Sequence, residues 1–242
     1  MNNTPIDKNG FINQAADFFN EVFGPALTGQ RGNIEIRTFK PATQSFFGSE
    51  SEAAEQAYQL CQQGVDVYFG VNPRIGNGGK KENIHYVSAF HAEIDYGFLG
   101  HKKPPVHESY EAALNAIQTF HLEPTIITHS GGGFHCYWVL SNPINVSDTG
   151  ISAIEGINKS LSISLGGDTG TQDISRVLRV PGTFNFKVQD NPRPVTLISN
   201  THHKYVYEDF KPFLPVEAAI SKPVTPNTSQ RGCRWQKAAH RA

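Results

Sequence analysis

Two carboxylates separated by one apolar residue are the first feature of the sequence that could perform chemistry. Glu93 and Asp95 lie in the string HAEIDYG, within an alternating run from Tyr86 to Tyr96. Such alternation predicts a β-strand, on which side chains two residues apart share a face, about 7 Å from each other. Neighbouring carboxylates repel each other unless a cation lies between them, and Mg²⁺ or Mn²⁺ favours hard oxygen ligands. The alternative is the solvated face of an ordinary strand.

A glycine-rich turn is the second such feature. The string SGGGFH, from Ser130 to His135, joins two apolar segments at 125–129 and 134–140. Three glycines let the backbone approach a ligand closely with its N–H groups exposed, and the serine and histidine add side-chain donors. The turn is therefore a candidate cradle for a triphosphate. The alternative is a hairpin with a core histidine, which would rarely need three glycines.

A basic string with two aspartates, DTGTQDISRVLRVPGTFNFK, spans residues 168–187. Asp168 and Asp173 are candidate metal ligands. Arg176 and Arg179 are three residues apart, which predicts that they share one face of a helical turn. Arginine side chains match the geometry of phosphate oxygens. The alternative is a surface helix with internal ion pairs.

Helices and strands that could position these residues follow from the periodicity of the chain. Amphipathic or capped segments predict helices at 12–23, 49–64, 107–121 and 149–165, the first of them ending near Gly24-Pro25. Apolar runs predict strands at 33–39, 65–71, 86–96, 125–129, 134–140 and 194–199. We expect loops at 76–83 and 97–105, and a linker or tail at 216–242. The first loop contains GNGGKK but lacks the first glycine and the final Ser or Thr of a phosphate loop, so we expect a mobile, solvated segment.

Composition narrows the class of protein. The 242 residues carry a net charge of −1, so any binding of nucleic acid must depend on a local basic patch. Cys61, Cys136 and Cys233 form no CxxC pair, which argues against a cysteine zinc site and makes the cytoplasm the expected compartment. The sequence has no signal-peptide pattern and no apolar run of about 18 residues, so we expect no membrane association.

The three strings, in this order, resemble the motifs of the archaeo-eukaryotic primase (AEP) superfamily. The likeness is strongest to the primase-polymerases of phages, plasmids and other mobile elements. AEID is similar to the acidic first motif, SGGGFH to the Ser–His second motif, and the aspartate ahead of a basic stretch to the third. VYFGVNPR at 67–74 is also typical of this branch, and the resemblance covers about residues 65–200.

The resemblance implies an α+β fold of two modules. A smaller N-terminal α/β module, residues 1–84, would pack against an RRM-like antiparallel sheet, residues 85–215, and residues 216–242 would follow as a tail. The cleft between the modules would hold template and nucleotide. The chemistry implied is two-metal phosphoryl transfer with Mg²⁺ or Mn²⁺.

The resemblance also implies roles for individual residues. Glu93, Asp95 and Asp168 would bind metal, with Asp173 as the second choice for the third carboxylate because it stands only three residues before Arg176. Arg179 could be structural. The remaining side chains would contact the triphosphate, the nucleotide or the template: Ser130, His135, Arg176 and Lys187 for the triphosphate, and Asn72 and Arg74 for the nucleotide or template.

The activity implied is that of a DNA primase-polymerase, which joins NTPs or dNTPs on a single-stranded DNA template. Its partners would include a helicase or other replication domain downstream. Two alternatives stay open. One is a non-catalytic replication or defence module that keeps the fold and binds nucleic acid, and the other is a metal-dependent nuclease or phosphodiesterase.

Overall fold

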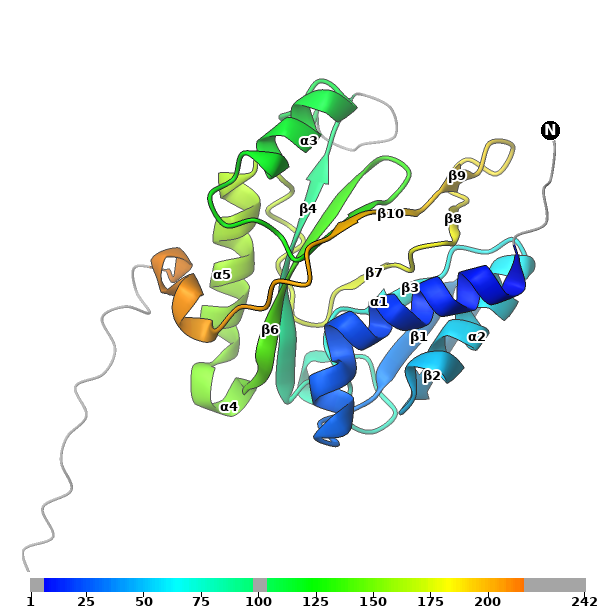
Figure 1. The fold of residues 1–242 in the computed structure, drawn as a ribbon, viewed down its shortest axis with the longest axis horizontal. Helices are drawn as coiled ribbons and strands as arrows, with labels where there is room; N and C mark the ends of the chain where they lie inside the picture. Colours follow the sequence, from blue (N-terminus) through cyan, green and yellow to red (C-terminus); the bar gives the residue numbers. More distant parts are fainter. Residues whose placement is uncertain (1–6, 98–103, 216–242) are drawn as a thin grey trace, which may run out of the picture.

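Two four-stranded antiparallel sheets organise the chain (Figure 1). The computed structural model describes residues 7–97 and 104–215, so most of the predicted loop at 97–105 and the predicted tail lie outside the described residues. The first sheet has the order β2-β1-β3-β7 and the second the order β10-β5-β6-β4. Their strands are β1 (Ile34–Phe39), β2 (Ala42–Phe47), β3 (Tyr68–Gly70), β7 (Val177–Arg179), β4 (Tyr86–Asp95), β5 (Ile126–His129), β6 (Gly133–Asn145) and β10 (Thr196–Asn200).

Helices cover both faces of the second sheet. The helices are α1 (Lys8–Thr28), α2 (Glu50–Gln62), α3 (Tyr110–Gln118), α4 (Val146–Thr149) and α5 (Ile151–Ser164), with 3-10 turns η1 (Lys81–Asn83) and η2 (Tyr207–Phe213) and a small hairpin of β8 (Phe184–Asn185) and β9 (Arg193–Pro194). In Figure 1, α3 and α5 lie on one side of the second sheet, and α1 lies on the side of the first sheet. The expected α+β class is confirmed.

Two hydrophobic cores meet at the second sheet, because successive side chains of a strand point to opposite faces. Phe90, Ala92 and Ile94 of β4 pack into the core formed with α3 and α5. On the other face, Ala89 and Tyr137 belong to the core that contains α1, α2 and the inner face of the first sheet. The face of β4 that carries Glu93 and Asp95 is therefore the face directed toward the first sheet.

Helix α1 continues past Gly24-Pro25, where its end was predicted. Pro25 has no N–H, so the carbonyl of Glu21 loses its helical donor. The ammonium of Lys204 replaces it by donating to that carbonyl at 2.6 Å and also pairs with the Glu21 carboxylate at 2.5 Å. The donor comes from far along the chain, so the local pattern around Pro25 could not predict it.

Arg176 and Arg179, for which a helical turn was predicted, instead lie just before β7 and at its last residue. This strand pairs with β3, placing Tyr68 opposite Arg179 and Gly70 opposite Val177. Pairing with a distant strand has overridden the local pattern. Strand β7 belongs to the first sheet although it follows β4, β5 and β6 in the sequence. The two sheets therefore do not divide the chain at one point, and the limits of the two modules stay a prediction.

In the described part of the chain, no helix is long and apolar enough to cross a membrane.

Candidate active site

A cavity of about 610 Å³ brings the three sequence strings together. Its walls come from the end of β4, the turn between β5 and β6, the segment after α5, β7 and the β8–β9 hairpin. The lining residues are Glu93, Asp95, Ser130, Gly131, Gly132, His135, Asp168, Arg176, Arg179, Asn185, Lys187, Val188, Asn191 and Arg193. Of the predicted site residues, Asn72 and Arg74 are absent from this lining.

Glu93 and Asp95 share one face of β4 because side chains alternate along a strand. Asp168 is attached to the same strand through a backbone hydrogen bond. The N–H of Asp168 donates to the carbonyl of Glu93 at 2.9 Å. Gly167 makes this approach possible, since a Cβ there would lie 2.4 Å from the same carbonyl oxygen. A glycine thus precedes Asp168 for a steric reason.

Glu93 is held by an arginine. The Nε of Arg176 donates to Glu93 Oε1 at 2.6 Å, and the two side chains are 36% and 16% exposed. Burial raises the pKa of Glu93, and the nearby charges of Asp95 and Asp168 raise it further, while Arg176 lowers it. Three carboxylates thus line the cavity together with four cationic side chains, and one of these cations, Arg176, pairs directly with Glu93.

As the side chains stand in residues 7–97 and 104–215, no three His, Cys, Asp or Glu groups are gathered closely enough to hold a metal ion. Part of the reason is visible in the contacts of the carboxylates. Glu93 is paired with Arg176, and Asp168 Oδ1 accepts a hydrogen bond from the N–H of Gly170 at 2.8 Å. The donor set nevertheless fits Mg²⁺ or Mn²⁺, because three carboxylates line one cavity and repel one another there.

The two candidate aspartates of the third string have different surroundings. Asp168 lines the cavity, whereas Asp173 does not. Asp173 pairs with the ammonium of Lys81 at 2.9 Å and accepts from the N–H of Ser175 at 2.7 Å. Burial would raise the pKa of Asp173, but the hydrogen bonds from Ser175 and Lys81 outweigh burial and lower it. Lys81 also pairs with Glu155 at 2.6 Å, so it is not the solvated loop lysine that the sequence predicted.

Internal hydrogen bonds hold the glycine-rich turn in place. Ser130 Oγ donates to the carbonyl of Gly133 at 3.0 Å, and Asn185 Nδ2 donates to the carbonyl of Ser130 at 2.9 Å. Gly131 has a φ of +85°, a conformation that favours glycine. Gly133 lies opposite Asp95, and a Cβ at Gly133 would lie 2.6 Å from the Asp95 carboxylate. Gly131 thus allows the backbone conformation of the turn, and Gly133 leaves room for the Asp95 carboxylate.

His135 lies opposite Glu93 in the pairing of β4 with β6. The side chain lines the cavity, although the residue is only 5% exposed. Burial lowers the pKa of His135 well below its usual range, and Arg179 and Arg176 contribute in the same direction. The neutral form of the imidazole is therefore favoured at pH 7. In this form His135 can bind a ligand through a hydrogen bond but not through a positive charge.

Comparison with solved structures identifies the fold. The AEP domain of the cyanophage S-2L primase-polymerase superposes with a TM-score of 0.57 at 18% identity, over 84% of this chain and 98% of that one. The catalytic domain of the primase RepB′, solved with initiator DNA, gives a TM-score of 0.55 at 15% identity, over 86% of this chain and 94% of that one. The chain has the AEP-domain fold. No protein-family model matches the sequence, and no curated protein matches it either.

The resemblance seen in the sequence motifs is thus confirmed at the level of the AEP-domain fold. Identities of 15–18% carry no residue roles from those proteins to this chain. The positions of Glu93, Asp95, Asp168 and His135 around one cavity come from the structure of this chain alone.

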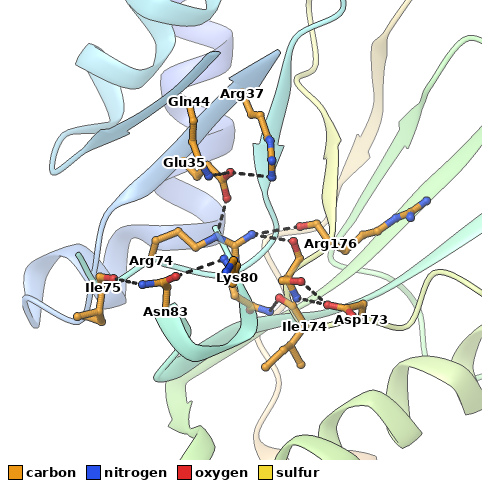
Figure 2. Close-up of polar contacts among 12 residues, drawn as sticks. Glu35, Arg37, Gln44, Arg74, Ile75, Lys80, Asn83, Asp173, Ile174 and Arg176 are labelled. Carbon is orange, nitrogen blue, oxygen red and sulfur yellow. Dashed lines mark hydrogen bonds and ion pairs between the residues drawn. The ribbon is translucent and has the colours of Figure 1, made fainter. Parts of the chain in front are cut away.

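Asn72 and Arg74 are not positioned to contact a nucleotide or template, contrary to the prediction. Both are fully buried. Figure 2 shows Arg74 between Glu35 and the segment that contains Ile174 and Arg176. Asn72 Nδ2 donates to the carbonyl of Ile174 at 3.1 Å, and Arg74 Nη2 donates to the carbonyl of Ser175 at 2.9 Å. Arg74 also pairs with the buried carboxylate of Glu35 at 2.6 Å. Their polar groups hold the backbone just before Arg176 within this AEP-type fold.

Arg193 is a cavity residue that sequence reasoning missed. Its Nη1 donates to the carbonyl of Gly131 at 2.9 Å. The β8–β9 hairpin places Arg193 opposite Asn185 and so beside the glycine-rich turn. The signal in the sequence is weak, because strands of two residues have no detectable periodicity and the partner turn lies about sixty residues earlier in the chain.

Proposed function

We propose that this chain is the catalytic core of a DNA primase-polymerase. It would transfer nucleotides from NTPs or dNTPs to a growing 3′ end opposite a single-stranded DNA template. One observation carries the proposal: three carboxylates and several cationic side chains line a single cavity beside a glycine-rich turn. A triphosphate with its divalent cation needs this combination of opposite charges. The named structural neighbours are a primase-polymerase and a primase, which supports the same conclusion.

Glu93, Asp95 and Asp168 are the residues that would hold Mg²⁺ or Mn²⁺. When bound, divalent cations would lower the pKa of the attacking 3′-hydroxyl and neutralise charge on the triphosphate. Both ions favour carboxylate oxygen, which is what these three side chains offer. Glu93 would have to exchange its present partner, Arg176, for this cation.

The side chains opposite the carboxylates would bind the triphosphate. Arg176, once released from Glu93, has a fork that matches two phosphate oxygens. Lys187 and Arg193 line the same cavity and add positive charge. Neutral His135 would donate one N–H to a phosphate oxygen, and Ser130 would keep the turn in shape through its bond to Gly133.

A non-catalytic binding module is the second candidate, and one observation favours it. The Glu93–Arg176 ion pair already neutralises part of the site without a metal ion. In such a protein, the pair would be a permanent structural contact. The cavity would then bind nucleic acid or nucleotide without turnover.

An extension assay separates the candidates. The purified chain is incubated with a primed and an unprimed single-stranded template, NTPs or dNTPs, and Mg²⁺ or Mn²⁺. Products longer than the primer, whose sequence follows the template, are expected. Binding of DNA without extension would support the non-catalytic module, and shortening of the DNA would support a nuclease.

A further inference from the structure

The outward face of the first sheet carries a row of polar and aromatic side chains across all four of its strands. Strand pairing places Gln44 opposite Arg37, Arg37 opposite Tyr68, and Tyr68 opposite Arg179. The residues that alternate with them, such as Ile36, Phe69 and Leu178, are buried in the core beneath. The row therefore lies on the side of the sheet away from α1 and α2.

Cations and rings contact one another along this row. The Arg37 guanidinium lies 5.0 Å from the centre of the Phe39 ring, and the Arg179 guanidinium lies 5.1 Å from that of Tyr68. The two rings meet edge to face with centres 5.2 Å apart. Phe39 is 51% exposed, so its ring remains accessible to a ligand. We call Gln44, Arg37, Phe39, Tyr68 and Arg179 the sheet-1 track.

The sheet-1 track connects two cavities. Arg179, at one end, lines the cavity that contains Glu93. Arg37 and Gln44, at the other end, line a second cavity of about 390 Å³, together with Gly78, Gly79, Lys80, Glu82 and Asn83. Figure 2 shows Arg37 and Gln44 side by side above Glu35. Three strand spacings of about 4.8 Å give the track a length of roughly 14 Å.

Acidic groups near the track are already engaged. Glu35 is fully buried and pairs with Arg74 at 2.6 Å, with Arg37 at a longer 3.6 Å. Asp66 accepts from Arg179 at 2.9 Å. Glu82 is exposed and lies 3.9 Å from Lys80. Each arginine of the track thus lies beside an acidic side chain, and Lys80, which is 82% exposed, adds a further cation at the end of the track that lines the second cavity.

We propose that the sheet-1 track binds single-stranded DNA. The exposed Phe39 ring would stack on a base, which any base permits because each has a π-face. The arginines would contact the phosphates on either side. Because the track leads to the cavity that contains Glu93, we identify the bound DNA as the template. This identification of the DNA as template rests on the proposed function.

Affinity for a short fluorescent single-stranded oligonucleotide tests the proposal, measured by anisotropy without metal or nucleotide. Phe39→Ala should weaken binding about fivefold or more through lost stacking. Arg37→Gln should weaken binding and also make its salt dependence shallower by about one phosphate contact. Matched controls are Ile163→Ala, with 58% exposure on α5, and Lys211→Gln, with 59% exposure in η2. Thermal melting checks that each variant is folded.

Unchanged affinity in both track variants would overturn the proposal, as would equal losses in the controls. Loss of self-association in Phe39→Ala, with DNA affinity unchanged, would instead make the track an interface between copies of the chain. The outcome is separable from that of the proposed function. A wild-type chain that binds through the track but never extends a primer would defeat the proposed function alone. If the Phe39→Ala and Arg37→Gln variants extend primers as well as the wild-type chain does, the proposed role of the track is wrong and the proposed function stands.

Discussion

At the scale of single residues, the third carboxylate illustrates what spacing can and cannot settle. The sequence offered Asp168 and Asp173 at different distances from Arg176. The structure places Asp168 in the cavity and pairs Asp173 with Lys81 outside it. The ion pair that could have identified the structural aspartate involves a residue more than ninety positions earlier, which no local pattern reveals.

The two aspartates should therefore respond differently to loss of charge. Asp168→Asn should lower nucleotide incorporation by at least about a hundredfold, because a divalent cation in the cavity would lose one of its three carboxylate ligands. Asp173→Asn should cost at most about 1 kcal/mol of stability, since its partner Lys81 is 40% exposed. Single-turnover incorporation and urea unfolding measure the two effects. The reverse pattern, with Asp173 essential and Asp168 dispensable, would reject the assignment.

His91 predicts a pH dependence of stability. Burial lowers its pKa from 6.5 to about 4 in the folded chain. Below pH 6.5 the unfolded chain therefore binds a proton that the folded chain does not. The free energy of unfolding should fall by up to about 3 kcal/mol as the pH decreases from 6.5 to 4. Urea unfolding across this range checks the effect, and a His91→Gln variant with an equally steep decline would contradict the assignment to His91.

At the scale of elements, the buried contacts of Arg74 join β1, the segment after β3 and the backbone before β7. Arg74 pairs with Glu35 and donates to the carbonyl of Ser175. The N–H of Val71 donates to the carbonyl of Arg176 at 3.0 Å. These bonds place Arg176, whose side chain then reaches Glu93 on the second sheet.

Breaking this buried pair should be costly. Arg74→Met would leave the Glu35 carboxylate buried without its main partner and should lower stability by about 3 kcal/mol. The double variant Glu35→Gln with Arg74→Met removes the charge and should recover part of that loss. Denaturant unfolding of both variants measures the difference. A cost of Arg74→Met near zero, or no recovery in the double variant, would show that the pair is not the stabilising contact described here.

Local patterns predicted most of these elements. The strand from Tyr86, the cap at Ser49 and the strands around the glycine-rich turn are formed as expected, because alternation and capping are properties of neighbouring residues. The prediction failed at β7, at the end of α1 and for Asn72 and Arg74. In each case the deciding partner, namely β3, Lys204 or the backbone of residues 174–176, is distant in sequence.

At the scale of the whole molecule, the cavity exists because both sheets contribute to it. The second sheet carries Glu93 and His135, and the first sheet contributes Arg179 through β7. The crossing of β7 back to the first sheet is therefore what closes the cavity around the carboxylates. The same crossing connects the cavity to the sheet-1 track.

The most direct test of the account compares incorporation of single nucleotides by the wild-type chain and a Glu93→Ala/Asp95→Ala variant. Each of the four nucleotides is offered opposite each template base, with Mn²⁺ or Mg²⁺ present, and circular dichroism confirms that the variant is folded. We expect incorporation matched to the template base in the wild type and a loss of more than about a hundredfold in the variant, which lacks two of the three carboxylates that would hold the cation. Extension by the folded variant at the wild-type rate, or a wild type that incorporates nothing, would contradict the account.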